Sequence, residues 1–461
     1  MTVEEQESYV FQSKVAHRQL SVIKGNGIKI TFKDPKTGKC TEALDAMTGA
    51  AVGALGWGDS EVVNFINEAA MATTYSYPGS MNNEFSEKLA KFYIDNSPKG
   101  AFASALWVTS GSEANENAMK IIRQYHLEKK NFKKTKFISR NTSYHGFTLG
   151  ALSIGNSARS KMFQEILLPT SQCLKVEPCY PYRNKKKGES LEQYGDRLVD
   201  EMEELILKED PDTIGGVIVE TLPGSSLGTV PPPANYLKGI RKLCNKYDIV
   251  FMVDEVMCGT GRINPNGKLN CWENFLTPEE SPDLQSVGKT LGSGYVTIAG
   301  VLISPKVKRA FVEGSGSIIG AQTYSSHAFN CYVALKIQER IKELKLTENI
   351  FNVGNYMGEK LKDALADSKI AGDVRGLGGF WSVELVKDRD TKESFPVGLD
   401  IAHRLQDICL SNGITVMGTQ GCNAGVGDII MLAPAFVITK VDADNIVSIV
   451  AKSVKELEGE L

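Results

Sequence analysis

Short runs rich in β-branched residues alternate with helical segments through the middle of the chain, and this alternation limits the fold more than any other feature. Strands separated by crossover helices pair in parallel, because each helix returns the chain to the same edge of the sheet. Five runs are typical of strands: 105–110, 136–139, 214–220, 249–255 and 297–304. The helical segments between them include 113–126 and 236–247. The pattern predicts an α/β fold with a large central, mostly parallel sheet and crossover helices.

A change in composition near residue 328 indicates a second, smaller unit with α+β character. It begins with a helical stretch, 328–344, continues with an alternating segment, 374–386, and ends in a helix from Ala443 onward. We predict that residues 1–55 form the N-terminal segment of this small domain, 56–328 the large ligand-binding domain and 329–461 the C-terminal small domain.

Charge and composition exclude several classes of protein. The net charge of −3 and the pI of about 6.1 argue against general nucleic-acid binding, and the basic runs 129–136 and 183–187 are interpreted as solvated loops. No apolar run is long enough for a membrane helix, and the acidic N-terminus lacks the features of a secretory signal or a transit peptide. Nine cysteines without C-x-x-C spacing suit a reducing compartment. We expect a soluble, cytoplasmic protein without nucleic-acid or membrane partners.

The residues that follow each predicted strand are candidate ligand-binding residues, because ligands of open α/β sheets bind beyond the carboxyl ends of the strands. After strand 105–110 come Gly111, Ser112 and Glu113, and Ser110 with Glu113 has the spacing of a capping box that opens the next helix. The free N–H groups of a helix N-terminus bind phosphate, and Gly111 lets the backbone approach closely. The segment is interpreted as an anion site, with an ordinary capped helix as the alternative.

Two acids follow neighbouring strands. Asp254 ends a run of apolar residues, and Glu220 ends the run before it. A buried carboxylate needs a cationic or hydrogen-bonding partner. The pair therefore indicates a ligand with positive or donor character, or a metal. A metal is disfavoured because no histidine lies near either acid in the sequence, so we predict none.

Lys289 lies in the tripeptide Gly288-Lys289-Thr290, which also occurs in nucleotide-binding loops. Such a loop needs a glycine five residues before Gly288, where this chain has Asp283, and the glycines after Lys289 would end the required helix. ATP or GTP binding is therefore disfavoured. Lys289 follows Asp254 by about one strand–helix–strand unit, so both side chains can face one crevice.

A phosphate site, an acid and a lysine in one crevice meet the needs of pyridoxal phosphate. The helix N-terminus would hold the phosphate, Asp254 would keep the pyridine nitrogen protonated, and Lys289 would form a Schiff base with the aldehyde. Tyr144, after strand 136–139, could stack on the ring. Lys289 is therefore interpreted as a covalent anchor.

Five motifs resemble, in order and spacing, those of the class III (omega) aminotransferases, which are pyridoxal-phosphate enzymes of fold type I. They are SGSEANENAMK (110–120), YHGFT (144–148), VDEVMCGTGR (253–262), PDLQSVGKTLGSGY (282–295) and TYSSHAFNCYVAL (323–335). The resemblance extends from about Asp45 to about Thr439. It implies a fold type I architecture and transaminase activity.

The resemblance also implies roles for individual residues. Lys289 would be the Schiff-base lysine, Asp254 the partner of the pyridine nitrogen, and Tyr144 the stacking residue; these three are the predicted catalytic residues. Thr323 would reach the phosphate of the neighbouring subunit, which implies a homodimer. The remaining predicted cofactor-binding residues are Ser110, Gly111, Ser112, His145, Glu220 and Val256. Arg262 and Arg375 match family arginines that we expect to be structural.

The chain departs from the family pattern at the substrate end. Many members carry an arginine for a substrate carboxylate in the C-terminal domain, but residues 412–431 contain neither arginine nor lysine. Lysine and neutral groups are poor substitutes for a bidentate clamp. Either an arginine elsewhere replaces it, or backbone N–H groups of the loop 421–427 do, or the donor is a plain amine. For an apolar donor, Trp57, Tyr77 and Phe85 are candidate pocket residues.

These observations predict an aminotransferase that moves an amino group from an amine or omega-amino acid to a 2-oxo acid by a ping-pong mechanism through the Lys289 Schiff base. The alternative is another fold type I enzyme with the same site, such as a decarboxylase, aminomutase or racemase. A non-catalytic binding protein is disfavoured, because Lys289, Asp254 and Tyr144 are all present.

Overall fold

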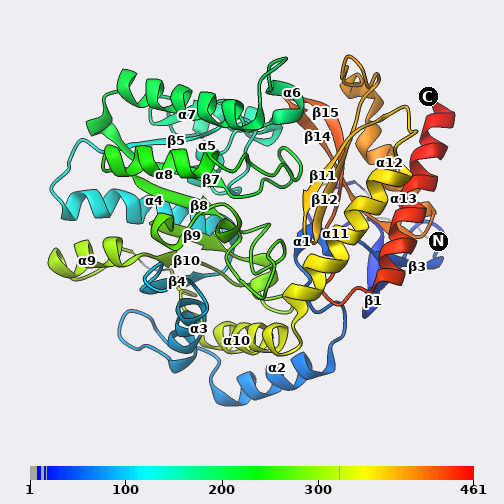
Figure 1. The fold of residues 1–461 in the computed structure, drawn as a ribbon. Helices are drawn as coiled ribbons and strands as arrows, with labels where there is room; N and C mark the ends of the chain where they lie inside the picture. Colours follow the sequence, from blue (N-terminus) through cyan, green and yellow to red (C-terminus); the bar gives the residue numbers. More distant parts are fainter. Residues whose placement is uncertain (1–7, 12–14, 17, 321) are drawn as a thin grey trace.

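The computed structural model describes residues 8–11, 15–16, 18–320 and 322–461, which form a large α/β part beside a smaller part (Figure 1). A seven-stranded sheet forms the centre of the large part, in the order β4-β10-β9-β8-β7-β5-β6. Only β10 is antiparallel to its neighbours, so the predicted mostly parallel sheet is confirmed. The strands are β4 (Ser104–Val108), β5 (Lys136–Arg140), β6 (Cys173–Val176), β7 (Ile214–Glu220), β8 (Val250–Asp254), β9 (Leu284–Val287) and β10 (Ala299–Ile303).

Helices cover both faces of this sheet, which explains why its strands are apolar on both sides. In β7, Val217 and Val219 pack into one hydrophobic cluster while Ile218 packs into another on the opposite face. The Ile218 face is covered by α4 (Gly111–Glu128), α5 (Leu149–Ile154) and α9 (Pro305–Glu313). The other face is covered by α3 (Glu84–Asp95), α7 (Leu191–Lys208) and α8 (Tyr236–Lys246).

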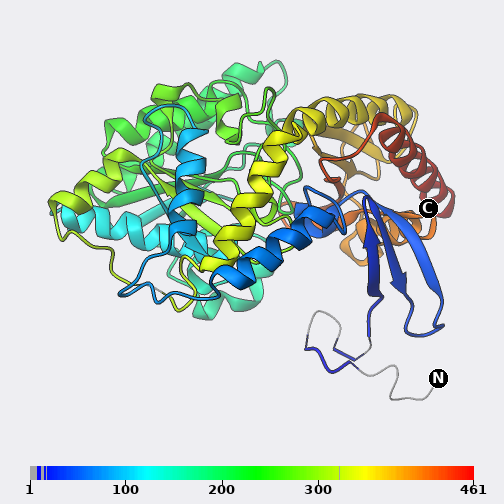
Figure 2. The same ribbon diagram turned by 90° about the horizontal axis from the view of Figure 1, so that it is seen from below.

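The smaller part contains two four-stranded sheets. One has the order β1-β2-β3-β13, and its strands are β1 (Ser21–Asn26), β2 (Lys29–Lys33), β3 (Cys40–Asp45) and β13 (Ile414–Thr415). The other has the order β11-β12-β15-β14, with β11 (Ala371–Leu377), β12 (Phe380–Leu385), β14 (Met417–Asn423) and β15 (Val426–Leu432). Because β13 pairs in parallel with β3, segments from both ends of the chain share one sheet. Figure 2 shows the N-terminal strands projecting beside the C-terminal elements.

Helices complete the smaller part and join it to the larger one. A single hydrophobic cluster combines residues of all these helices but the first with the inner face of β12 and β15. The helices are α1 (Thr48–Ala51), α2 (Ser60–Ala72), α10 (Ala328–Glu343), α11 (Leu346–Ala364), α12 (Ile401–Ser411) and α13 (Lys440–Glu460). Within the described ranges, no helix is sufficiently long and apolar to span a bilayer.

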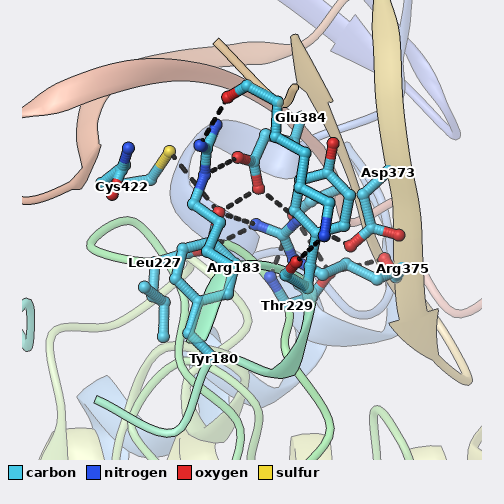
Figure 3. A network of polar contacts seen from close by, with 12 residues as sticks. Tyr180, Arg183, Leu227, Thr229, Asp373, Arg375, Glu384 and Cys422 are labelled. Carbon is cyan, nitrogen blue, oxygen red and sulfur yellow. Dashed lines mark hydrogen bonds and ion pairs between the residues drawn. The ribbon is translucent and has the colours of Figure 1, made fainter. Parts of the chain in front are cut away.

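Buried arginines tie the two parts together (Figure 3). Arg375 on β11 donates to Glu384 at 2.6 Å and to the Leu227 carbonyl at 2.7 Å, while Arg183, in the short helix α6 (Pro181–Asn184), donates to Glu384 at 2.6 Å. Arg262 donates to the carbonyls of Gly379 and Pro434, in the smaller part. These contacts agree with the expectation that Arg262 and Arg375 are structural.

Candidate active site

Residues that follow five different strands of the large sheet meet around one cavity of about 420 Å³. The carboxyl ends of β4, β5, β7, β8 and β9 lie at the same edge of the sheet, because these strands run in the same direction. The cavity is lined by Val52, Thr109, Ser110, Gly111, Ser112, Asn115, Tyr144, His145, Gly146, Glu220, Leu222, Ser225, Asp254, Val256, Met257, Lys289, Gly294, Val296, Thr297 and Ile298. Nine of the ten predicted cofactor-binding residues therefore share one site.

Asp254 is held by donors on both carboxylate oxygens. Its Oδ2 lies 2.8 Å from both Asn115 Nδ2 and His145 Nδ1. Its Oδ1 accepts from the Val256 N–H at 3.0 Å and from Ser286 Oγ at 3.1 Å. Burial alone would raise the pKa of Asp254, but these hydrogen bonds outweigh it and keep the pKa below its ordinary value. The site therefore contains a fixed negative charge at the end of β8.

Lys289 follows β9 and begins a single turn of 3₁₀ helix, Lys289–Leu291. Its φ of 48° lies in the left-handed region, which non-glycine residues adopt mainly where the surrounding structure imposes it. Burial lowers the pKa of its amine to about 8, against the opposing charge of Asp254. No described residue accepts a hydrogen bond from Nζ. The chain thus presents a buried amine that is easily deprotonated and has no protein acceptor.

Helix α4 starts at the wall of the cavity. Ser110 and Glu113 form the predicted capping box, which occupies the Glu113 N–H, while no described residue accepts from the Gly111 and Ser112 N–H groups. These two groups and the positive end of the helix dipole suit an anion. Gly111 is also required for packing, since a Cβ there would lie 2.6 Å from Val256 Cγ1.

The segment after β5 supplies an aromatic wall. Tyr144 lines the cavity, and the Arg159 guanidinium carbon lies 4.8 Å from the centroid of its ring. His145 is fully buried, with Nδ1 on Asp254 and no partner for Nε2. Gly146 has a φ of 133° and brings the Phe147 N–H within 2.9 Å of Ser112 Oγ. The segment is thereby fastened to the start of α4.

Glu220 pairs in register with Asp254 on the neighbouring strand, so the two acids lie together as the sequence indicated. Burial raises the pKa of Glu220, although Arg140, with its guanidinium 3.6 Å from Oε2, opposes this shift. Oε2 is buried and accepts no hydrogen bond from a described residue. Within the described ranges, no group of three or more metal-ligating side chains is gathered in a way that could hold an ion.

Thr323 is the one predicted cofactor-binding residue that does not line this cavity in its own chain. It is exposed, and its neighbour Gln322 donates to Glu113 Oε2 at 3.2 Å, near the start of α4. The proposed pocket aromatics are also absent from the wall: Trp57 donates to Asp45, Tyr77 is exposed, and Phe85 packs edge-on against Tyr332.

The loop 421–427 does not reach the cavity either. Residues 421–425 instead line a second cavity, of about 320 Å³, together with Ala158 and Lys161. The suggestion that backbone N–H groups of this loop hold a substrate carboxylate therefore stays a prediction, which the lining of the main cavity does not support.

Several site residues were missed by sequence reasoning. Asn115 and Ser286 donate hydrogen bonds to Asp254, Ser225 lines the cavity, and Arg159 contacts Ser225. Asn115 gave one usable signal, because it is a polar residue on the buried face of α4. Behind the site, Glu255 accepts four hydrogen bonds, from Thr221, Gln285 and the N–H groups of Cys271 and Trp272.

Comparison with known proteins gives a consistent result. The family model described as "Aminotransferase class-III" matches residues 11–454. An uncharacterized aminotransferase of Schizosaccharomyces pombe is 33% identical over 98% of this chain and 95% of its own length. Gamma aminobutyrate transaminase 3 of Solanum lycopersicum is 32% identical over 90% of this chain and 77% of its own length.

A solved structure leads to the same family. The omega transaminase of Pseudomonas jessenii, in complex with PMP, superposes with a TM-score of 0.87 at 28% identity and covers 96% of this chain and 93% of its own. Its architecture, a large sheet beside a smaller sheet domain, is the one described above. The family model and the relatives both extend over nearly the whole chain, and the chain belongs to the class III aminotransferases.

Proposed function

We propose that this aminotransferase binds pyridoxal phosphate in the 420 Å³ cavity and uses it to transfer an amino group from an amine or omega-amino acid to a 2-oxo acid. The observation that carries the proposal is the buried Lys289 amine, which shares the cavity with the ionised Asp254. Unpaired groups around the cavity fit the cofactor. The Gly111 and Ser112 N–H groups suit its phosphate, and His145 Nε2 and Glu220 Oε2 are buried and make no hydrogen bond to a described residue.

Each wall of the cavity has a proposed part in holding the cofactor. The start of α4 would bind the phosphate, Asp254 would accept a hydrogen bond from the ring nitrogen and keep it cationic, and Tyr144 and Val256 would enclose the ring. When bound, the cofactor supplies an aldehyde for Lys289 and a ring that accepts electrons from the reacting carbon. His145, Asn115 and Ser286 position Asp254, because each holds one of its oxygens.

Lys289 would have two tasks. In the resting enzyme its Nζ would bond to the aldehyde of the cofactor. Once released, the Nζ would take a proton from the donor carbon as a base and later return a proton as an acid. A pKa near 8 suits both directions, since base and acid forms are then both accessible near neutral pH.

The donor class rests on the relatives, whose names include a gamma aminobutyrate transaminase and an omega transaminase. The described structure supports a homodimer in one respect, since Thr323 is exposed beside other exposed aromatic and apolar residues, Tyr324, Ile318 and Ile319. We propose that Thr323 completes the phosphate site of the partner subunit.

Borohydride reduction followed by peptide mass analysis tests the proposal directly. The cofactor mass should be found on the peptide that contains Lys289. Lys175 is the internal control, because its pKa is also lowered to about 8 but its amine donates to Ser139, Ser153 and Ile154. Label on Lys175, or none, would contradict the assignment.

The same assignment predicts the behaviour of the variant Lys289→Ala. It should fold and still bind some cofactor, because Asp254 and the start of α4 remain, but it should lose turnover. Transamination that persists in the variant would show that another lysine is the anchor. Release of carbon dioxide, or an isomerised amine without any oxo acid, would identify one of the other fold type I reactions.

A further inference from the structure

We propose that Arg159, which contacts the cavity-lining residues Tyr144 and Ser225, binds the carboxylate of the 2-oxo acid substrate. The inference rests on the proposed function, which requires an acceptor with a carboxylate next to the reacting carbonyl. Neither the family motifs nor the C-terminal segment 412–431 of this chain provides a cation for that group. Arg159 lies in the 3₁₀ segment Ala158–Ile166, which follows α5 on the large part.

The contacts of Arg159 place it against the cavity wall. Its guanidinium lies over the Tyr144 ring at 4.8 Å, and its Nη1 is 3.4 Å from Ser225 Oγ. Tyr144 and Ser225 both line the cavity. Burial is the main cause of the lowered pKa of the Lys289 amine, and the charges of Arg262 and Arg159 lower it further. Arg159 thus contacts two wall residues of the cavity without lining the cavity itself.

The guanidinium of Arg159 also has N–H donors that bond no described residue. No carboxylate of a described residue lies within 4 Å of it, and its single protein hydrogen bond leaves most of its five donors unused. Stacking on an aromatic ring fixes the plane of the fork without using its edge. A planar carboxylate can therefore dock on the exposed edge through two parallel hydrogen bonds, the arrangement in which arginine outperforms lysine.

Other cationic side chains near the site either bond protein groups or line a different cavity. Arg262 donates to backbone carbonyls of the smaller part, and Arg140 faces Glu220. Lys161 is two residues further along the same segment, but it lines the second cavity beside Gly425. Among the described residues around the active-site cavity, Arg159 is the cation that combines an open edge with contacts to the wall.

The test compares acceptors with and without the carboxylate. For Arg159→Met, kcat/KM for pyruvate relative to that for acetaldehyde should fall by about 10- to 100-fold, the loss of one charge-assisted contact. Most of this change should be in KM. Arg159→Lys, which keeps the charge but not the fork, should recover only part of the ratio. Lys161→Met is the matched control, and it should leave the ratio as in the unaltered protein.

A binding measurement separates this inference from the proposed function. Calorimetry with butanoate, with butanamide as the neutral control, should show weaker butanoate binding in Arg159→Met and unaltered binding in Lys161→Met. If the unaltered protein has no transaminase activity but binds butanoate through Arg159, the proposed function fails and the carboxylate site stands. If Arg159→Met binds butanoate normally, or loses pyruvate and acetaldehyde activity equally, the assignment of Arg159 is wrong.

Discussion

Lys289 is the residue in which backbone, burial and charge act together. Its backbone lies in the left-handed region. Burial is the largest cause of the lowered pKa of its amine and so favours the neutral form. Only the neutral amine has a lone pair that can attack an aldehyde. The environment of the residue that carries the proposed chemistry therefore reduces the free energy of unfolding, through backbone strain and the burial of an ionisable amine.

The apoprotein should bond pyridoxal phosphate at a rate that follows the titration of this amine. Below the pKa of about 8 most Nζ groups are protonated, so the rate should rise as the pH increases toward 8 and level off above it. Stopped-flow absorbance after mixing measures this rate. In Arg159→Met the midpoint should move upward, because the charge that helps to lower the pKa is gone. A plateau reached only near the ordinary lysine value of 10.5 would contradict the burial argument.

The sequence could predict the residues that follow strands directly, because strand direction alone brings them together. Asp254 and Tyr144 were found in this way, whereas Lys289 was found through its glycine-rich turn and its spacing from Asp254; each lines the cavity. Arg159 could not be found in this way, because it lies beyond α5 in a 3₁₀ segment that follows no strand, and only its contact with the Tyr144 ring in the folded chain places it near the cavity. Ser286 was hidden for a similar reason, since its hydroxyl matters only through its contact with Asp254.

Among the elements, α4 links packing to binding most closely. Its first residue, Gly111, touches Val256 so closely that any side chain must displace one of them. Gly111→Ala should therefore cost about 1–3 kcal/mol of stability through overpacking and weaken cofactor binding, because the N–H groups move. Thermal unfolding and cofactor titration measure the two effects.

The double variant Gly111→Ala/Val256→Ala provides the control for this prediction. Removing the two Val256 methyl groups makes room for the new Cβ, so the double variant should recover part of the lost thermal stability. If the second substitution only adds to the first, the close contact is not the cause of the loss.

The strands show where local patterns succeed and fail. β7 was predicted with its observed bounds, Ile214–Glu220, because it is apolar on both faces. β9 was not predicted, because half of its four residues are polar. Gln285 bonds Trp272 and Glu255, and Ser286 bonds Asp254. The polar side chains of β9 are therefore buried with hydrogen-bond partners from other elements, which the sequence of the strand alone does not reveal.

At the scale of the whole molecule, the proposed dimer makes a specific prediction. Homodimers of Lys289→Ala should be inactive, and those of Thr323→Ala should hold the cofactor weakly. Mixed dimers should contain one site with both Lys289 and the partner subunit's Thr323, so co-expression should recover activity and cofactor retention. Chromatography with separate tags on the two chains isolates the mixed species. Activity no higher than that of the Thr323→Ala homodimer would contradict a shared site.

The large-scale architecture was predictable only in part. The central sheet followed from alternating strands and helices, and the C-terminal helix from its periodicity. The pairing of β3 with β13 leaves no local signal, because β13 has two residues and its partner lies far away in the sequence. The division at residues 55 and 328 remains a proposal, and α10, which starts at Ala328, belongs to the hydrophobic clusters of both parts.

The pairing of β3 with β13 has a consequence for biosynthesis. Thr415 Oγ1 donates to Asp45 Oδ1 at 2.7 Å, and β13 pairs with Leu44 and Asp45, so it covers the end of the edge that β3 would otherwise expose. On the ribosome this edge has no partner until nearly the whole chain has emerged. Unpaired strand edges recruit other chains, so nascent copies on one messenger are vulnerable to aggregation through this strand until translation is almost complete.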